Sequence, residues 1–324
     1  MKRKTTGELE ERSKLDSLLR SYAHPGPVEW MRTGIHAVDL ALGGGLPRGR
    51  IIEIAGPDFV GKTLLGLSAM AAFQRAGAAC MFANSEAGET AERIENLGVD
   101  IERIRYEEPE TVEQFRHGMH DFVESVRKVD KKAPIYILLD SVANLTSDNQ
   151  WEDDKELGEV PKDNGQPGVR ALAFSKFFAE FAVYLKRNDV TLVCNNQIRD
   201  KIGAMFGKKT DSPGGHALKH NASVRIDLGR GKKFENADRT EYQGCVCYFR
   251  VEKNRFATPF RKVELRINPT QGFDPWSGLP EILLASKRLT LKKAGVFRFG
   301  EEEFASQELP AFVEKHPELL APWL

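Results

Sequence analysis

The sequence predicts an α/β fold with a largely parallel central sheet, and three observations predict it. Between residues 30 and 269, apolar runs alternate with helical stretches, as expected for a sheet covered on both faces. A glycine-rich segment at residues 56–63 lies between a strand-like run and a helix-like run. Three further apolar runs end in polar side chains, and open α/β sheets bind ligands at such strand ends.

The chain divides into three predicted segments. Residues 1–29 are predicted to form an amphipathic helix at 6–23 and a linker at 24–27. The helix is predicted because its apolar side chains share one face, which needs a docking surface; they are Leu15, Leu18, Leu19 and Tyr22. Residues 30–269 form the α/β core. After it, the turn-rich run at 269–278 predicts a small helical C-terminal module over residues 270–324.

Composition restricts the class of protein. The chain has 324 residues, with 47 basic and 47 acidic side chains, so a nucleic-acid partner must be argued from local clusters rather than from net charge. The four cysteines lie in apolar runs without zinc-ligand spacing, which predicts buried, reduced thiols. Because the basic N-terminus leads into acidic residues and no apolar run reaches membrane-spanning length, we expect a cytoplasmic protein without a membrane partner.

The glycine-rich segment fits the phosphate-binding pattern G-x-x-x-x-G-K-T. A strand-like run at 50–55 precedes it and a helix-like run at 64–73 follows, as the pattern requires. We expect Lys62 to reach the β- and γ-phosphates of a nucleotide and the Thr63 hydroxyl to ligate Mg²⁺. The alternative is an accidental match in a glycine-containing loop. The predicted nucleotide-binding residues are Gly56, Pro57, Asp58, Phe59, Val60, Gly61, Lys62, Thr63 and Leu64.

The other strand ends supply the remaining chemistry of a triphosphate site. Glu86 follows the run 80–85 and is a candidate for polarising the attacking water. Asp140 follows 136–139 and is the candidate Mg²⁺ partner of Thr63. The run 190–194 leads into three amides, at 195–197, that could sense a γ-phosphate, with Gln197 the last. Each residue alone is equally well a helix cap or a solvated turn.

The segment 198–215 predicts a single-stranded DNA-binding loop. Residues 199–209 carry four basic side chains and one acidic, interleaved with apolar groups, which suits phosphates beside bases. A helix opening at 214–216 offers a further phosphate site. The alternative is a disordered surface loop. The expected DNA contacts are Arg199, Lys201, Ile202, Met205, Phe206, Lys208, Lys209, Gly214, Gly215 and His216.

A second long loop, at about 146–168, is acidic. Its 146–163 portion has seven acidic residues and two lysines, so it cannot hold phosphates by bulk charge. Trp151 and Arg170 are candidates for contact with nucleic acid, and ordinary surface packing explains both equally well.

At these residues the chain resembles the RecA family of homologous-recombination proteins, over about residues 32–268. The segments 33–50 and 196–207 carry the resemblance beside the phosphate-binding loop. It implies a RecA-like ATPase core, a helical filament on single-stranded DNA with ATP and Mg²⁺ between neighbouring subunits, and pairing with homologous double-stranded DNA. It also implies docking of the N-terminal helix on the adjacent core. Glu86 would be the catalytic carboxylate and Gln197 the coupling residue.

The resemblance extends to further positions, with departures. Lys253 and Arg255 match two basic residues that act on the neighbouring subunit's nucleotide, although a cross-strand salt bridge is an equal interpretation. Arg93 stands where the family usually stacks a tyrosine on adenine, and Thr90 where an acid is common. The segment 272–278 resembles virus-encoded relatives, so a bacteriophage origin, and hence the host cytoplasm, is a hypothesis.

Two rival functions remain open at the level of sequence. One is a helicase or branch-migration motor on the same fold, because residues 253–256 also resemble a motif of such relatives. The other is an ATP-gated, non-catalytic coat on single-stranded DNA. A separate single-strand-binding protein or loader is a possible partner under any of these functions.

Overall fold

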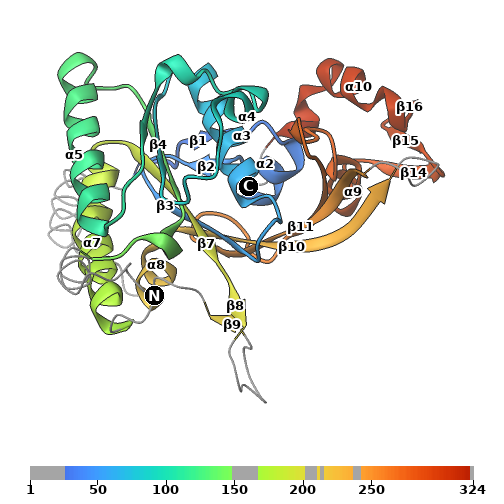
Figure 1. The fold of residues 1–324 in the computed structure, drawn as a ribbon. Helices are drawn as coiled ribbons and strands as arrows, with labels where there is room; N and C mark the ends of the chain where they lie inside the picture. Colours follow the sequence, from blue (N-terminus) through green and yellow to red (C-terminus); the bar gives the residue numbers. More distant parts are fainter. Residues whose placement is uncertain (1–25, 148–166, 201–209, 212–214, 236–241, 322–324) are drawn as a thin grey trace, which may run out of the picture.

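The computed structural model describes residues 26–147, 167–200, 210–211, 215–235 and 242–321, and it confirms the α/β fold (Figure 1). Its main feature is a nine-stranded sheet in the order β13-β12-β11-β10-β3-β7-β6-β4-β5. Before the first strand of this sheet in the sequence, β1 (Trp30–Met31) and β2 (Leu46–Pro47) form a two-stranded antiparallel pair. The predicted N-terminal helix lies outside the described residues. No helix in the described ranges is long and apolar enough to cross a bilayer.

One half of the sheet is parallel, as the sequence predicts. It consists of β3 (Ile51–Gly56), β7 (Val190–Gln197), β6 (Ile135–Asp140), β4 (Ala79–Asn84) and β5 (Ile104–Glu107), hydrogen-bonded in that order. Every residue of β3 and β6 is buried, which explains why these strands read as continuous apolar runs. The carboxyl ends of these five strands meet at one edge of the sheet.

The other half of the sheet is antiparallel, and the sequence pattern did not predict this. It begins with β10 (Val224–Glu235), which pairs parallel with β3 but antiparallel with β11 (Tyr242–Asn254). β12 (Lys262–Asn268) and β13 (Gly272–Phe273) follow. β12 alternates exposed and buried residues, the pattern of a strand with one covered face. The sheet is therefore parallel in its centre and on one side only.

Two hydrophobic cores cover the two faces of the sheet. Alternate residues of β4 point into each, with Phe82 in one core and Met81 in the other. The first core includes α2 (His36–Leu42) and α3 (Lys62–Arg75). The second includes α5 (Val112–Val129), α7 (Pro167–Arg187) and α8 (Gly215–Asn221), which Figure 1 shows stacked together at one side. α4 (Ala91–Asn96) and the short turns η1 (Ile101–Arg103) and η2 (Val142–Asn144) connect the parallel strands.

The C-terminal module is not purely helical, which corrects the expectation from its turn-rich entry. It contains α9 (Leu279–Ala285) and α10 (Leu309–Lys315), but also a three-stranded antiparallel sheet. Phe297 and Phe304 from this sheet belong to the first core, so the module packs on the main body. The remaining elements are β14 (Thr290–Lys293), β15 (Val296–Phe299), β16 (Glu302–Ala305), η3 (Ser306–Glu308) and η4 (Pro317–Leu320).

Candidate functional site

Two glycines shape the loop between β3 and α3. Gly61 has φ +94° and precedes the first residue of α3, in a left-handed conformation that side chains rarely adopt. A Cβ on Gly61 would lie 2.8 Å from Ile267 Cδ1, and a Cβ on Gly56 would lie 2.6 Å from the Leu228 carbonyl oxygen. The loop therefore wraps tightly at the start of a helix, where backbone N–H groups attract anions.

Lys62 is the first residue of α3, directly after this loop, and is buried. Its ammonium donates to the carbonyl oxygens of Gly56, at 3.1 Å, and Pro57, at 2.7 Å. Burial lowers the pKa of Lys62, while the carboxylates of Asp58, Asp140 and Glu86 oppose that shift. A cation held mainly by neutral carbonyls in a buried position is well placed to stabilise a phosphate.

Thr63 and Asp140 meet at the floor of the site. The Thr63 hydroxyl donates to Asp140 Oδ2 at 2.5 Å, joining the first turn of α3 to the end of β6. Asp140 is buried, and burial, followed by the charge of Glu86, raises its pKa, although the Thr63 hydrogen bond opposes this. A hydroxyl and a carboxylate are oxygen donors of the kind Mg²⁺ uses, and a cation would offset the cost of burying this carboxylate. The residues present therefore fit a magnesium ion.

Glu86 and Gln197 are brought together at the ends of β4 and β7. Gln197 Nε2 donates to Glu86 Oε1 at 3.4 Å, across 111 residues of sequence. The two other amides of this strand end have different surroundings. Asn195 and Asn196 are fully buried; the Asn195 side chain lies beside Asp140 and helps to lower its pKa, whereas Asn196 donates to Glu53 inside the sheet and so does not face the site. Of the three amides, Gln197 contacts Glu86 directly.

A cavity of about 700 Å³ collects these side chains. Its walls include most of the predicted nucleotide-site residues: Asp58, Phe59, Gly61, Lys62, Thr63, Leu64, Glu86, Arg93, Asp140 and Gln197. Gly56, Pro57 and Val60 do not line it. The Val60 side chain is 2% exposed and packs into the core, so of that residue only the backbone is left to hold a phosphate.

Five lining residues were not predicted from the sequence: Gly88, Glu89, Cys245, Ile267 and Pro269. The last three come from the antiparallel half of the sheet. Nothing in the local pattern of those strands shows that they approach the phosphate loop, because the pairing that brings them there is long-range. Glu89 had a usable signal, since it is an acidic residue four positions before Arg93, with which it forms an ion pair.

Arg93 and Thr90 lie at the start of α4. The Arg93 guanidinium pairs with Glu89 at 3.1 Å, and Thr90 caps the helix by accepting from the Arg93 backbone N–H at 3.3 Å. Burial raises the pKa of Glu89, although Arg93 opposes the shift. Thr90 is thus occupied as a cap. Phe59, in contrast, extends from the phosphate loop with 95% of its surface exposed and φ +58°.

Lys253 and Arg255 form no cross-strand salt bridge with any residue in the described part of the chain, where that interpretation is therefore wrong. The Lys253 ammonium donates to the carbonyls of Lys219, at 3.0 Å, and His220, at 3.1 Å. The Arg255 guanidinium donates to the same His220 carbonyl at 3.0 Å. Both cations therefore hold the C-terminal end of α8, where the helix dipole favours positive charge. Neither lines the 700 Å³ cavity.

The predicted DNA-binding loop begins and ends in a short ribbon. β8 (Arg199–Asp200) pairs antiparallel with β9 (Thr210–Asp211), and α8 starts at Gly215 with His216 in its first turn. Arg170 lies in the first turn of α7. Most of the acidic loop, with Trp151, lies outside the described residues. So do the other predicted DNA contacts, which are Lys201, Ile202, Met205, Phe206, Lys208, Lys209 and Gly214.

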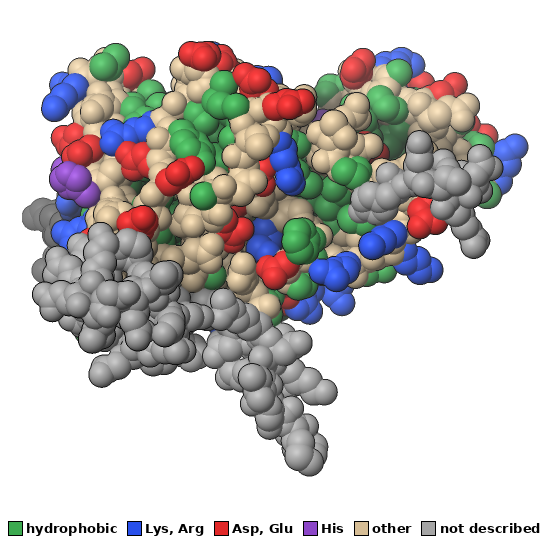
Figure 2. Space-filling view, viewed as in Figure 1, with side chains coloured by type: hydrophobic (Ala, Val, Ile, Leu, Met, Phe, Trp, Pro, Cys, Tyr) green, Lys and Arg blue, Asp and Glu red, His purple; other side chains and the backbone are tan. Residues whose placement is uncertain are grey.

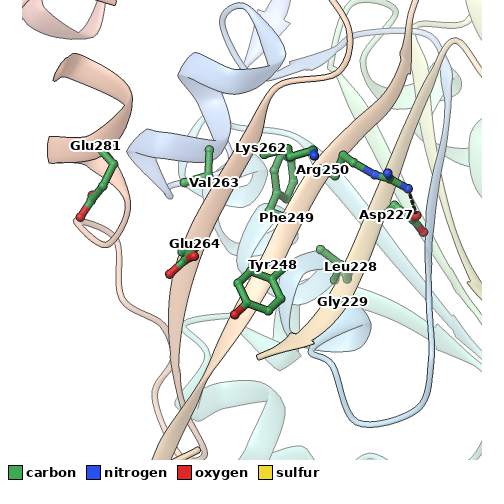
Figure 3. Close-up of a pocket in the computed structure, with 10 residues that line it drawn as sticks. All are labelled: Asp227, Leu228, Gly229, Tyr248, Phe249, Arg250, Lys262, Val263, Glu264 and Glu281. Atoms are coloured by element: carbon green, nitrogen blue, oxygen red, sulfur yellow. Dashed lines mark hydrogen bonds and ion pairs between the residues drawn. The ribbon is translucent and has the colours of Figure 1, made fainter. Parts of the chain in front are cut away.

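A second cavity, of about 650 Å³, lies on the antiparallel half of the sheet beside α9 (Figure 3). Tyr248 and Arg250 from β11 line it, and Arg250 forms ion pairs with Asp227 and Glu252. Its one lining residue from a helix N-terminus, Glu281 in the first turn of α9, is acidic and would repel a phosphate. The chemistry needed to hold a triphosphate is therefore in the first cavity and not in this one.

The surface near this second cavity is basic. Figure 2 shows Lys and Arg side chains gathered along the edge formed by β10 and β11. The exposed Arg230, Lys232 and Lys233 lie on β10, and the Arg230 guanidinium also donates to the Asp58 carbonyl at 2.8 Å. A protein without net charge thus carries a local cationic cluster that reaches the phosphate-binding loop.

Comparison with known proteins identifies the family. Residues 8–274 match the model of the RecA N-terminal domain. The chain belongs to the RecA family. Protein RecA of Paracoccus denitrificans is 34% identical over 90% of this chain and 78% of its own length, and Protein RecA of Bartonella henselae is 35% identical over 90% and 80%. Protein RecA of Colwellia psychrerythraea is 35% identical over 90% of this chain and 81% of its own. The match to the family model ends at residue 274, just after β13.

Proposed function

We propose that this RecA-family protein is an ATP-dependent DNA recombinase that forms helical filaments on single-stranded DNA and pairs it with homologous double-stranded DNA. The observation that carries the proposal is the contact between Gln197 and Glu86, at 3.4 Å. Glu86 lies in the nucleotide cavity, and Gln197 is followed directly by the basic, apolar-interleaved loop. Hydrolysis and DNA binding would therefore share one side-chain contact.

The residues of the cavity have distinct roles in the proposed ATP hydrolysis. Lys62 and the backbone of the phosphate loop bind the triphosphate and stabilise charge that develops on it. Glu86 orients and deprotonates the attacking water, a role suited to an exposed carboxylate at a strand end. Mg²⁺, held by Thr63 and Asp140, would neutralise phosphate charge. Arg93 would stack on the base in place of an aromatic ring.

Gln197 would couple the two activities. A γ-phosphate offers an acceptor to its amide, so nucleotide binding would move the side chain away from Glu86 and place the attached loop. The expected DNA contacts of this loop are cations for phosphates and apolar side chains for bases. The basic edge of β10 offers a further surface for DNA.

Lys253 and Arg255 would complete the site of a neighbouring subunit in the filament. In the structure of one chain they hold the end of α8, so their release would accompany assembly. We propose that the N-terminal segment docks on the adjacent core, and that hydrolysis therefore depends on polymerisation.

Strand invasion tests the proposed function. Labelled single-stranded DNA is mixed with homologous supercoiled duplex, ATP and Mg²⁺, and joint molecules are counted for the wild type, for Lys62→Ala and for a heterologous duplex. Homology-dependent joints made only by the wild type are expected. DNA-stimulated hydrolysis without joints would point to a motor, and DNA binding without hydrolysis would point to a coat.

A further inference from the structure

A buried carboxylate lies beneath the proposed site and takes no part in it. Glu53 is on β3, three residues before Gly56, and none of its surface is exposed. Its two oxygens have different partners. Asn196 Nδ2 on β7 donates to Oε1 at 2.8 Å, and the Arg225 guanidinium on β10 pairs with Oε2. The three side chains form a polar link across adjacent strands of the sheet.

One arm of this link reaches the N-terminal end of the predicted DNA-binding loop. Asn196 immediately precedes Gln197, the residue that contacts Glu86. The Ile198 backbone N–H donates to the Gly56 carbonyl at 3.2 Å, so the residue that follows β7 also contacts the start of the phosphate loop. Glu53 thus holds the strand that presents Gln197.

The other arm reaches the C-terminal end of the same loop. Arg225 is directly opposite Lys253 in the β10–β11 register. Lys253 and Arg255 donate to carbonyls at the end of α8, the helix that follows the loop. Burial lowers the pKa of Lys253, the charges of Arg255 and Arg225 add to that shift, and Glu53 opposes it. Glu53 therefore offsets a cluster of three cations.

Stability alone does not account for this arrangement. A buried ion pair stabilises a fold weakly, and well-packed apolar side chains of the same volume often serve as well or better. Its value lies in geometry, because hydrogen bonds to both carboxylate oxygens allow only one relative placement of the three strands. The link joins β7 and β10 to β3, the strand that enters the phosphate loop.

We propose that Glu53 is a positioning residue that joins both ends of the DNA-binding loop to the phosphate-binding strand and thereby couples nucleotide binding to DNA binding. The proposal rests on the proposed function, because it needs a chain that hydrolyses ATP and binds single-stranded DNA. It assigns to Glu53, Arg225 and Asn196 a role in communication and none in the chemical step.

The test is Glu53→Gln in the full-length chain. The amide keeps the volume of the side chain and an acceptor for Asn196 but removes the charge that holds Arg225. We expect nucleotide affinity and DNA-independent hydrolysis to stay within about threefold of the wild type. The stimulation of hydrolysis by single-stranded DNA is expected to fall at least tenfold, and a non-hydrolysable ATP analogue should no longer tighten DNA binding.

The matched control is Asp227→Asn. Asp227 also lies on β10 and pairs with an arginine of β11, at 2.8 Å, but it has no link to β7. The Asp227→Asn variant should leave the stimulation of ATP hydrolysis by single-stranded DNA unchanged. Unchanged stimulation in Glu53→Gln would overturn the proposal, and so would equal losses of basal and stimulated hydrolysis, since those indicate a purely structural role. A wild type that shows no DNA stimulation would instead refute the proposed function.

A second variant covers the case in which Glu53→Gln does not fold. Glu53→Gln combined with Arg225→Gln removes both members of the ion pair and leaves no uncompensated buried charge. This double variant is expected to fold and to show the same selective loss of DNA stimulation. A double variant with wild-type stimulation would overturn the proposal.

Discussion

The parallel and antiparallel halves of the sheet contribute different things to the nucleotide cavity. The parallel half supplies the polar side chains of the site, each at or just after the end of a strand, in the loop that follows it or in the first turn of the next helix. The antiparallel half supplies Cys245, Ile267 and the adjacent Pro269, which are wall residues without charge. The difference indicates that chemistry comes from strand ends in one half, while the other half determines the shape of the cavity.

Loss of the Lys62 cation is expected to have the largest effect, and it tests whether the parallel half of the sheet supplies the chemistry. In Lys62→Ala we expect ATP hydrolysis to fall by more than about 10³-fold, because both phosphate binding and stabilisation of developing charge are lost. A steady-state phosphate-release assay measures it. Lys262→Ala, in the second cavity on the antiparallel half, serves as control and should hydrolyse ATP normally.

Removal of the Glu86 charge should affect turnover and spare binding. We expect Glu86→Gln to lower kcat by roughly 10²–10³-fold, as for loss of a general base, with nucleotide Kd changed less than about threefold. Filaments formed with ATP should persist in electron micrographs. Glu89→Gln, another carboxylate change in the same cavity, should leave kcat within a few fold, and absence of filaments in Glu86→Gln would contradict the assignment.

Truncation of the antiparallel wall should affect binding and spare turnover. Ile267 is 5% exposed and lies against the phosphate loop beside Gly61. We expect Ile267→Ala to weaken nucleotide binding by roughly 3- to 10-fold through lost apolar contact, with kcat unchanged at saturation. Val263→Ala on the same strand, also 5% exposed, has a similar cost in stability and should not change nucleotide Kd. Equal changes of nucleotide Kd in Ile267→Ala and Val263→Ala would contradict the idea that the antiparallel half shapes the cavity through its wall residues.

The smallest expected effect concerns the helix that supports the antiparallel half. Asp39 of α2 is buried and accepts from the Thr33 backbone N–H and hydroxyl, both at 2.8 Å, yet burial raises its pKa to about 7. The folded state therefore retains a proton that the unfolded state releases near pH 4, so stability declines as pH rises from about 4 to 7. Asp39→Asn should remove this decline. Denaturant titrations at several pH values measure the free energy of unfolding, and Asp39→Asn is expected to raise it on the order of 2 kcal/mol at pH 8. Parallel pH profiles for the wild type and the variant would contradict the assignment.

The sequence predicts the parallel half well because its signals are local. Gly56, Gly61 and Lys62 stand at fixed spacing between a strand and a helix, and Glu86, Asp140 and Gln197 directly follow apolar runs. In the structure, Gly61, Lys62, Glu86, Asp140 and Gln197 from these signals line one cavity. The same local logic failed at Asn196, because it cannot tell which amide of a strand end points into the sheet.

The antiparallel half was not predictable in the same way. The approach of Ile267 to Gly61 depends on three successive strand pairings, from β3 through β10 and β11 to β12, and no residue near Ile267 encodes them. Lys253 and Arg255 illustrate the same limit. Their charges suggested a salt bridge, but the end of α8 supplies carbonyl acceptors that a linear sequence does not reveal. The strands of the C-terminal module were missed for a related reason, since β14 is exposed throughout and carries no alternating pattern.

Cys245 gives the nucleotide cavity a natural chemical reporter. The other three cysteines are buried, and burial raises the pKa of Cys80 and Cys247 to about 12 and that of Cys194 well above its ordinary value. Cys245 is only half-buried and lines the cavity wall. A thiol-directed fluorophore should therefore modify this position first, and a bound nucleotide should protect it, so labelling kinetics would report occupancy of the site in the unmodified protein without an introduced probe.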